Sequence, residues 1–271
     1  MKELLDTGLG SVRVFLKRDD NKARKLRYNL GHPRVLTFGG AYSNHIRAVA
    51  AAGLRHGFAT IGVIRGEERL PLNPSLAHAA SRGMTLTYLD RDTYRRKQTP
   101  EVEAALRERW GDVLILPEGG SNAAAVRGCA ELPPEIEAEF EDSTGGAYDV
   151  VCCPVGTGGT LAGIAAGLPA GRRALGFAVL KGAGFLAAEV ARLQREAYGR
   201  VWDNWSIDLD HHFGGYARTT PELRAFAARH GVEEVYVAKM LLGIVARARS
   251  GGFTPGTRVV AVVTGEPFPP M

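Results

Sequence analysis

Apolar runs rich in β-branched residues alternate with Ala- and Leu-rich helical patterns along almost the whole chain. Alternation of this kind builds βαβ units, in which successive strands are parallel and helices cover the sheet. We therefore predict an α/β protein built on mostly parallel sheets. The expected strands are residues 12–16, 35–38, 60–64, 85–89, 113–116, 149–153, 174–179 and 259–263. The expected helices are residues 43–56, 75–82, 100–110, 185–198, 221–230 and 237–250.

Residues 131–147 interrupt the alternation, because they carry paired prolines, an acidic run and two glycines. We interpret this stretch as a connection between two lobes. In open parallel sheets, ligands bind beyond the carboxyl ends of the strands. Two such ends are glycine-rich here, at residues 39–40 and 156–159. If they belong to different lobes, the ligand site lies in the cleft between the lobes.

The composition of the 271-residue chain excludes several classes of protein. No apolar run approaches the roughly 18 residues that a membrane span needs, and the first residues do not resemble a secretion signal. We expect no membrane partner and a cytoplasmic location. The formal net charge of +5 comes from scattered basic residues without an aromatic-lined basic stripe, so we expect no nucleic-acid partner.

The three cysteines, Cys129, Cys152 and Cys153, lack metal-ligand spacing. Cys152 and Cys153 are adjacent within an expected strand, where successive side chains point to opposite faces. We therefore predict buried free thiols, as in a reducing compartment, and no metal site.

A glycine-rich segment of sequence PVGTGGT, residues 154–160, joins an expected strand to a small-residue helix. Glycines let the backbone turn tightly, so that several N–H groups meet one anion at the positive end of the helix. This predicts a bound phosphorylated cofactor, although a plain turn can have the same composition. A dinucleotide-binding dehydrogenase is a weaker alternative, since no acidic residue is well placed about 20 residues on. The predicted phosphate contacts are Gly156, Thr157, Gly158, Gly159 and Thr160.

Lys22 lies in the first turn of a short expected helix, with Asp20 or Asn21 as its cap. The helix dipole favours anions at this end, so the Lys22 ammonium loses its proton more easily, as a nucleophilic amine requires. Alternatively, Lys22 belongs to a solvated basic face together with Arg24 and Lys25.

A hydroxyl, an amide and an imidazole stand together at the start of the expected helix 43–56, on Ser43, Asn44 and His45. A helix start with these groups suits a carboxylate ligand. Ser43 and Asn44 also fit an ordinary helix cap. A similar composition recurs in the segment EGGSN, residues 118–122, and we predict that Gly119 and Gly120 contribute to the same substrate site.

Taken together, the motifs KRDD, NKARK, GGAYSNH, PEGGSN and GTGGT resemble those of the 1-aminocyclopropane-1-carboxylate deaminase and D-cysteine desulfhydrase family in order and spacing. The resemblance covers nearly the whole chain. It implies a two-lobed fold type II enzyme, also called tryptophan synthase β-like, with pyridoxal 5'-phosphate in the cleft between the lobes, and a homodimer. We assign residues 1–30 and 131–271 to the large cofactor-binding lobe and residues 31–130 to the small lobe.

The resemblance also implies cofactor contacts. Lys22 matches the lysine that binds the cofactor aldehyde, and Asn44 matches the amide that hydrogen-bonds the pyridoxal 3-oxygen. The glycine-rich segment 154–160, which we call the glycine loop, matches the phosphate site. Thr264 resembles the hydroxyl partner of the pyridine nitrogen, which leaves the ring a weaker electron sink than a carboxylate partner would, and this suits elimination chemistry.

For the substrate, Ser43 resembles the hydroxyl that contacts the substrate carboxylate and assists proton transfer. Tyr216 and Tyr236 match phenols that approach the substrate, although an amphipathic core tyrosine is the alternative for each. His45 matches a capping or substrate-orienting group rather than a catalytic one.

The chain departs from the family pattern in several places, one of which is Glu266 in place of a final glycine after Thr264-Gly265. A glycine-containing insert is absent before Asn21, and Val237-Ala238 stands where family members have Thr-Gly or Glu-Gly. We predict a pyridoxal-phosphate lyase or deaminase that converts a small amino acid to ammonia and an α-keto acid. D-cysteine or a related β-substituted alanine is favoured over the cyclopropane substrate, because Val237 lacks the expected acid. The missing insert leaves a second hypothesis open, a degenerate member that binds the cofactor or an amino acid without turnover.

Overall fold

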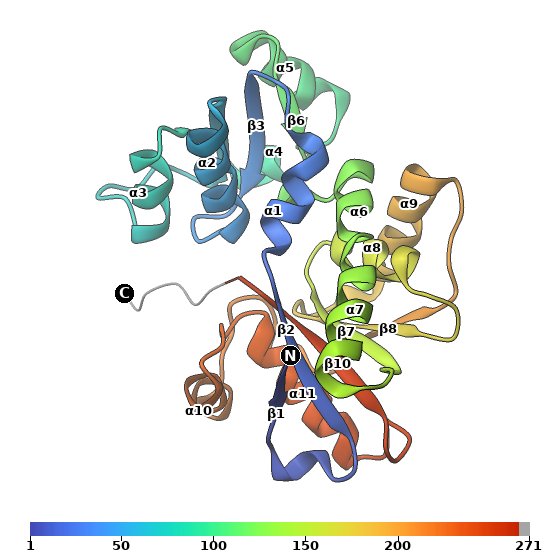
Figure 1. Ribbon diagram of the computed structural model, residues 1–271. Coiled ribbons are helices and arrows are strands. Elements are labelled where there is room, and N and C mark those ends of the chain that lie inside the picture. The colour runs from blue at the N-terminus through green and yellow to red at the C-terminus, as the bar shows by residue number, and fades with distance from the viewer. Residues whose placement is uncertain (266–271) are drawn as a thin grey trace.

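The computed structural model describes residues 1–265, and within them two β-sheets are covered by helices (Figure 1). The strands of the larger sheet are β1 (Lys2–Leu4), β2 (Arg13–Asp19), β7 (Val150–Val155), β8 (Arg173–Ala178), β9 (Trp205–Asp208) and β10 (Arg258–Thr264). Those of the smaller sheet are β3 (Arg34–Gly39), β4 (Ala59–Arg65), β5 (Thr85–Leu89) and β6 (Leu114–Leu116). Each expected strand is present, and the short strands β1 and β9 are additional. The departure from the family pattern at Glu266 lies outside the residues that the structure describes.

The larger sheet has the order β1-β2-β10-β7-β8-β9 and the smaller has the order β5-β4-β3-β6. All neighbouring strands are parallel except the pair β1 and β2. The prediction of an α/β protein with mostly parallel sheets is therefore confirmed. The lobe boundaries at residues 30 and 130 stay a prediction.

Helices were predicted correctly at α2 (Asn44–His56), α3 (Pro74–Ser81), α5 (Pro100–Trp110), α9 (Leu186–Tyr198), α10 (Pro221–His230) and α11 (Val237–Arg249). Shorter helices are α1 (Asn21–Leu26), α4 (Arg91–Arg95), α6 (Ala123–Cys129) and α8 (Gly159–Gly167). Single 3-10 turns are η1 (Thr7–Leu9), η2 (Arg27–Asn29), η3 (Glu118–Gly120) and η4 (Ala183–Phe185). No helix among the described residues is long and apolar enough to cross a bilayer.

Residues 131–147 do not form an irregular linker, because helix α7 (Leu132–Thr144) occupies most of the stretch, and along the chain this helix lies between β6 of the smaller sheet and β7 of the larger sheet. Pro133 and Pro134 lie in its first turn, where a missing N–H costs nothing. Gly145 ends the helix in the left-handed conformation, with φ 62°. Ile136 and Phe140, one turn apart, are fully buried in the core. An apolar stripe hidden in an acidic segment therefore builds a core-facing helix.

Both faces of the larger sheet are buried. Helices α7, α8 and α9 pack on one face around Cys153, and helices α10 and α11 pack on the other around Cys152. The two adjacent cysteines thus point to opposite faces, as predicted. All three cysteines are buried and free.

Three carboxyl strand ends lie side by side, because β10 is between β2 and β7. Thr264 at the end of β10 pairs in register with Asp19 at the end of β2. Helix α1 follows β2, and the glycine loop follows β7. The neighbouring strands β3 and β6 of the smaller sheet lead into α2 and η3, both of which contact α1. Helix α1 therefore lies at the junction of the two sheets (Figure 1).

Candidate active site

Lys22 is the second residue of α1, which begins directly after strand β2. The Asp20 carboxylate caps the helix by accepting a hydrogen bond from the Ala23 N–H at 3.0 Å. Arg24 ties the same helix to Asp19, with 2.7 Å between Nη2 and Oδ1, and to a carboxylate of α7. The short connection thus still starts a capped helix, and Lys22 is held at the carboxyl edge of the larger sheet.

The amine of Lys22 is surrounded by protein, although part of the residue stays exposed. Burial, and next the nearby ammonium of Lys25, lower the pKa of Lys22 to about 7. A large fraction of this amine is therefore neutral at neutral pH, whereas an ordinary lysine is almost wholly protonated. The expected lowering of the pKa is present, and desolvation is its largest cause.

Lys25 is only 4% exposed, so the alternative of a solvated basic face is wrong for this residue. Its ammonium donates to Ser121 Oγ at 3.0 Å and to the Gly119 carbonyl oxygen at 3.3 Å. Burial lowers the pKa of Lys25. Its hydrogen-bond partners among residues 1–265 are thus neutral, and a buried cation is costly without an anion. Sequence reasoning missed Lys25, although its three-residue spacing from Lys22 places both on one helix face.

The glycine loop after β7 faces Lys25. Gly158 has a left-handed φ of 81°, and Gly159 begins α8. A Cβ at Gly159 would lie 2.6 Å from Ser121 Oγ and 3.4 Å from Lys25 Nζ. The hydroxyl of Thr157 hydrogen-bonds that of Ser121 at 2.6 Å. A helix N-terminus, two hydroxyls and a buried ammonium therefore meet at one point, which fits a phosphate group.

Thr160 is turned toward helix α1. Its hydroxyl donates to Asn21 Oδ1 at 2.9 Å, and the Cys129 thiol lies 3.8 Å from the same oxygen. Asn21 is buried and directly precedes Lys22. Through Asn21, this hydrogen bond joins α1, which carries Lys22, to α8, whose N-terminus follows the glycine loop. This link was not predicted from the sequence.

On the side of the smaller sheet, Ser43 and Asn44 open α2. Ser43 Oγ accepts from the Ile46 N–H at 3.3 Å, so Ser43 is a helix cap. Its hydroxyl hydrogen stays available as a donor. The side-chain oxygen of Asn44 accepts from Arg47, which leaves the amide NH₂ as the outward donor.

His45 is 3% exposed, and its Nε2 lies 2.8 Å from Thr37 Oγ1. Thr37 donates its own proton to the Leu116 carbonyl, so His45 Nε2 is the donor and Nδ1 is buried without a partner among the described residues. Burial, and then the ammonium groups of Lys22 and Lys25, hold the pKa of His45 well below its usual value. His45 is therefore a neutral imidazole next to the candidate site.

The glycines of η3 permit two close approaches. A Cβ at Gly120 would lie 2.7 Å from His45 Cε1, and a Cβ at Gly119 would lie 2.7 Å from Thr157 Oγ1. Both glycines also have left-handed backbone, with φ 72° at Gly119 and 67° at Gly120. The turn can therefore seat the smaller sheet against the glycine loop only without side chains.

Tyr216 and Tyr236 lie together, with ring centroids 5.9 Å apart in an edge-to-face arrangement. A Cβ at Gly156 would lie 3.4 Å from Tyr236 Cε1, so this ring borders the glycine loop. Burial and the neighbouring Tyr216 hold the pKa of Tyr236 well above its usual value. Tyr216 is 42% exposed. The structure thus places the phenol of Tyr236 at the glycine loop, and that of Tyr216 directly beside Tyr236.

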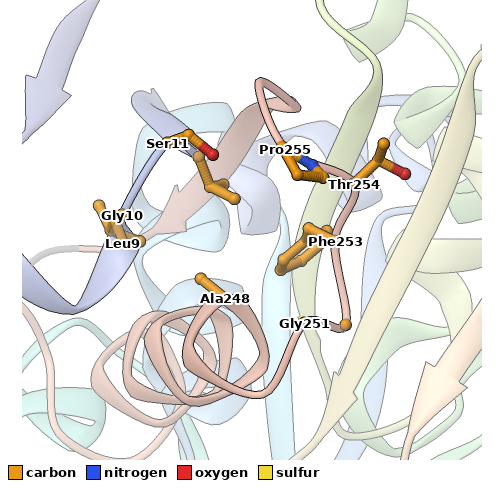
Figure 2. A pocket seen from close by; sticks show the side chains of 10 residues that line it. Leu9, Gly10, Ser11, Ala248, Gly251, Phe253, Thr254 and Pro255 are labelled. Atoms are coloured by element: carbon orange, nitrogen blue, oxygen red, sulfur yellow. The ribbon is translucent and has the colours of Figure 1, made fainter.

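A separate pocket of about 510 Å³ lies at the other edge of the larger sheet (Figure 2). Its walls come from residues 9–12, just before β2, and residues 251–255, just before β10. It therefore opens at the amino ends of the strands, and none of its lining side chains titrates. It is not part of the candidate active site.

The buried ammonium, two hydroxyls and helix N-terminus, together with an amine of lowered pKa, lie at the carboxyl ends of parallel strands, an arrangement that suits a phosphorylated cofactor beside a nucleophilic lysine. Residues 7–265 match the model of the family "Pyridoxal-phosphate dependent enzyme", and the chain belongs to this family. The prediction that pyridoxal phosphate is the cofactor is thereby confirmed.

Two named relatives and one crystal structure add detail to this family assignment. The chain is 31% identical to a protein of Pyrococcus furiosus named "Putative 1-aminocyclopropane-1-carboxylate deaminase", over 93% of this chain and 84% of the relative. A protein of the same name from Thermotoga maritima is also 31% identical, over 88% and 84% of the two chains. The crystal structure of an ACC deaminase homologue superimposes with a TM-score of 0.77 at 26% identity, over 95% of this chain and 85% of the other. The resemblance to the deaminase family and the fold type II architecture are confirmed.

Proposed function

We propose that this protein is a pyridoxal-phosphate lyase or deaminase that converts a small amino acid to ammonia and an α-keto acid. The placement of Lys22 supports this most strongly, because its half-neutral amine stands beside the cradle formed by Lys25, Ser121 and the glycine loop. When bound, pyridoxal phosphate supplies an aldehyde for amines and a ring that stabilises negative charge on the substrate α-carbon.

The side chains of the cleft divide the remaining work. Lys22, once its amine is free, takes and returns the proton at the substrate α-carbon. Ser43 donates its hydroxyl hydrogen to the substrate carboxylate, and Asn44 donates its NH₂ group to the cofactor 3-oxygen. The phenol of Tyr236 stays protonated because its pKa is raised, so it donates to a leaving group and does not act as a base. Thr264, at the end of the strand between β2 and β7, is the hydroxyl partner of the ring nitrogen.

D-cysteine is the proposed substrate, in preference to 1-aminocyclopropane-1-carboxylate. Val237, the first residue of α11, is fully buried in the core and carries no carboxylate. This favours D-cysteine even though relatives of the chain are named as deaminases of the cyclopropane. We expect sulfide, pyruvate and ammonia from D-cysteine, at a kcat/KM more than about tenfold above that for 2-oxobutanoate release from the cyclopropane. That ratio corresponds to about 1.4 kcal/mol of transition-state preference.

Colorimetric assays of sulfide and keto acid on the reconstituted holoenzyme test this preference. Turnover of the cyclopropane alone would contradict the substrate assignment and leave the lyase proposal standing. A fully loaded cofactor site with no turnover across D- and L-amino acids would reject the enzyme and favour the degenerate binding protein. The homodimer and the cytoplasmic location stay predictions.

Capture of the cofactor by the apoprotein is expected to depend on pH around 7. Only the neutral amine attacks the aldehyde, and the pKa of Lys22 is about 7. Raising the pH from 6 to 8 should therefore speed capture about tenfold, with little gain above pH 8. Stopped-flow absorbance measures the rate. An increase that continues to pH 10 would show that Lys22 keeps the pKa of an ordinary lysine.

A further inference from the structure

Lys239 is a fully buried lysine in α11, three residues after Tyr236. Its ammonium donates a hydrogen bond to the carbonyl oxygen of Gly215, with 2.6 Å between the heavy atoms. Burial lowers the pKa of Lys239, and the carboxylate of Glu233 partly offsets that effect. Burying an ammonium costs free energy, so its position needs an explanation. Lys239 contacts neither the phosphate cradle nor the amine of Lys22.

The carbonyl that Lys239 contacts belongs to a turn with unfavourable backbone conformations. Phe213 and Ala217 have positive φ angles of 50° and 55°, although neither is glycine. Gly214 and Gly215 between them have φ 89° and 110°. Left-handed conformations at non-glycine residues persist only where the surroundings hold them. The turn carries Tyr216, so whatever holds the turn also positions that phenol.

The turn makes further contacts within itself, with residue 181 and through side-chain packing. Gly215 N–H donates to the His212 carbonyl at 3.1 Å, and Arg218 N–H donates to the Gly215 carbonyl at 3.1 Å. A Cβ at Gly215 would lie 3.3 Å from the Cβ of Lys181, so the turn rests on that segment. The turn also meets α11 through packing, since Phe213 lies against the core cluster of α11 and the ring of Tyr216 lies against that of Tyr236. Lys239 adds to this packing the hydrogen bond from α11 to the turn backbone, three residues after Tyr236, the N-cap residue of α11.

We propose that Lys239 is a positioning residue, which holds the left-handed turn 213–217 on helix α11 and thereby keeps the phenol of Tyr216 beside that of Tyr236. The inference rests on the proposed function, because it assigns the two phenols to the substrate site. Lys239 acts through Tyr216 and touches neither the substrate nor the cofactor. Helix α11 thus begins directly after one phenol, that of Tyr236, and through Lys239 fixes the place of the other.

A double-mutant cycle on the holoenzyme tests this coupling. Lys239→Met removes the hydrogen-bond donor and keeps the length of the side chain. We expect Lys239→Met and Tyr216→Phe each to lower kcat about 10- to 100-fold, and the double variant to be no slower than the slower single variant. The dissociation constant of pyridoxal phosphate should change less than about twofold, since the cradle is untouched. Losses that multiply in the double variant would overturn the proposal.

Amide hydrogen exchange, followed by mass spectrometry on the peptide 209–218, supplies a readout that needs no substrate. Lys239→Met should speed exchange in this peptide about tenfold or more, because local opening there loses its tie to α11. The control Lys2→Met, which removes an exposed lysine from β1, should leave the exchange unchanged. Unchanged exchange in Lys239→Met would refute the proposal.

The two readouts distinguish failure of the positioning role of Lys239 from failure of the proposed enzyme function. Faster exchange in Lys239→Met, together with a wild type that turns over no substrate, would support the positioning role of Lys239 and reject the proposed function. If Lys239→Met does not fold, Lys239→Gln provides the test, because its amide can still donate to the Gly215 carbonyl. We expect Lys239→Gln to keep more protection in the peptide than Lys239→Ala. Equal protection in these two variants would refute the positioning role of Lys239.

Discussion

Replacing Lys22 with alanine is expected to abolish covalent attachment of pyridoxal phosphate and to lower turnover by at least about 10³-fold. In the proposed function its amine binds the cofactor aldehyde, and burial with the neighbouring Lys25 lowers its pKa to about 7. Non-covalent binding should survive, because the contacts of Lys25, Ser121 and the glycine loop remain. The visible absorption spectrum, followed by borohydride reduction and peptide mass analysis, measures the attachment.

The control for this experiment is Lys2→Ala, which removes an exposed lysine on β1 and should leave the spectrum unchanged. Cofactor fixed to the peptide of Lys22 in the wild type would establish its role. Cofactor fixed to Lys25 would contradict the assignment and make the second lysine of α1 the nucleophile. No visible band in the wild type would mean that the shortened connection before Asn21 prevents covalent attachment.

Replacing Lys25 with methionine is expected to change affinity and stability in opposite directions. Loss of a charge-assisted contact to the phosphate should raise the dissociation constant of pyridoxal phosphate about 10- to 100-fold, or about 1.4 to 2.8 kcal/mol. The cofactor-free protein should become more stable, because a buried ammonium whose hydrogen-bond partners among residues 1–265 are neutral gives way to an apolar side chain of similar length. Fluorescence titration measures the affinity, and thermal unfolding of the apoprotein measures the stability.

Lys17→Met is the control, since Lys17 is a half-buried lysine that already pairs with the carboxylate of Glu139. Its loss should leave cofactor affinity unchanged and should not stabilise the apoprotein. A Lys25→Met protein that unfolds more easily and binds the cofactor as tightly as the wild type would make Lys25 a structural residue. The phosphate would then depend on the backbone of the glycine loop and the hydroxyls of Ser121 and Thr157.

Much of the fold follows from local patterns. The alternation of β-branched runs and helical stretches predicted the parallel sheets, because a buried strand and a covering helix each impose their own periodicity on neighbouring residues. The segment 131–147 shows what local composition hides: its prolines, acids and glycines interrupt the pattern of alternation, yet Ile136 and Phe140 make most of it a core helix. Prolines in a first helical turn do not break a helix, and composition alone does not reveal that position.

The candidate site divides in the same way. The sequence by itself determined the glycine loop before α8, the lysine in the first turn of α1 and the polar start of α2, since each is a motif of consecutive residues with its own physical reason. It also determined the family to which these motifs belong. The role of each side chain remains a proposal for the experiments above.

Only the tertiary structure decided which groups meet. Lys25 reads as a solvated residue in the sequence, yet packing of α1 against α6 and the glycine loop buries it beside Ser121. Lys239 likewise reaches Gly215 from 24 residues away and in another element. A side chain's pKa and its partners depend on the burial and charge that distant segments bring around it, and a local pattern of residues carries no information about that environment.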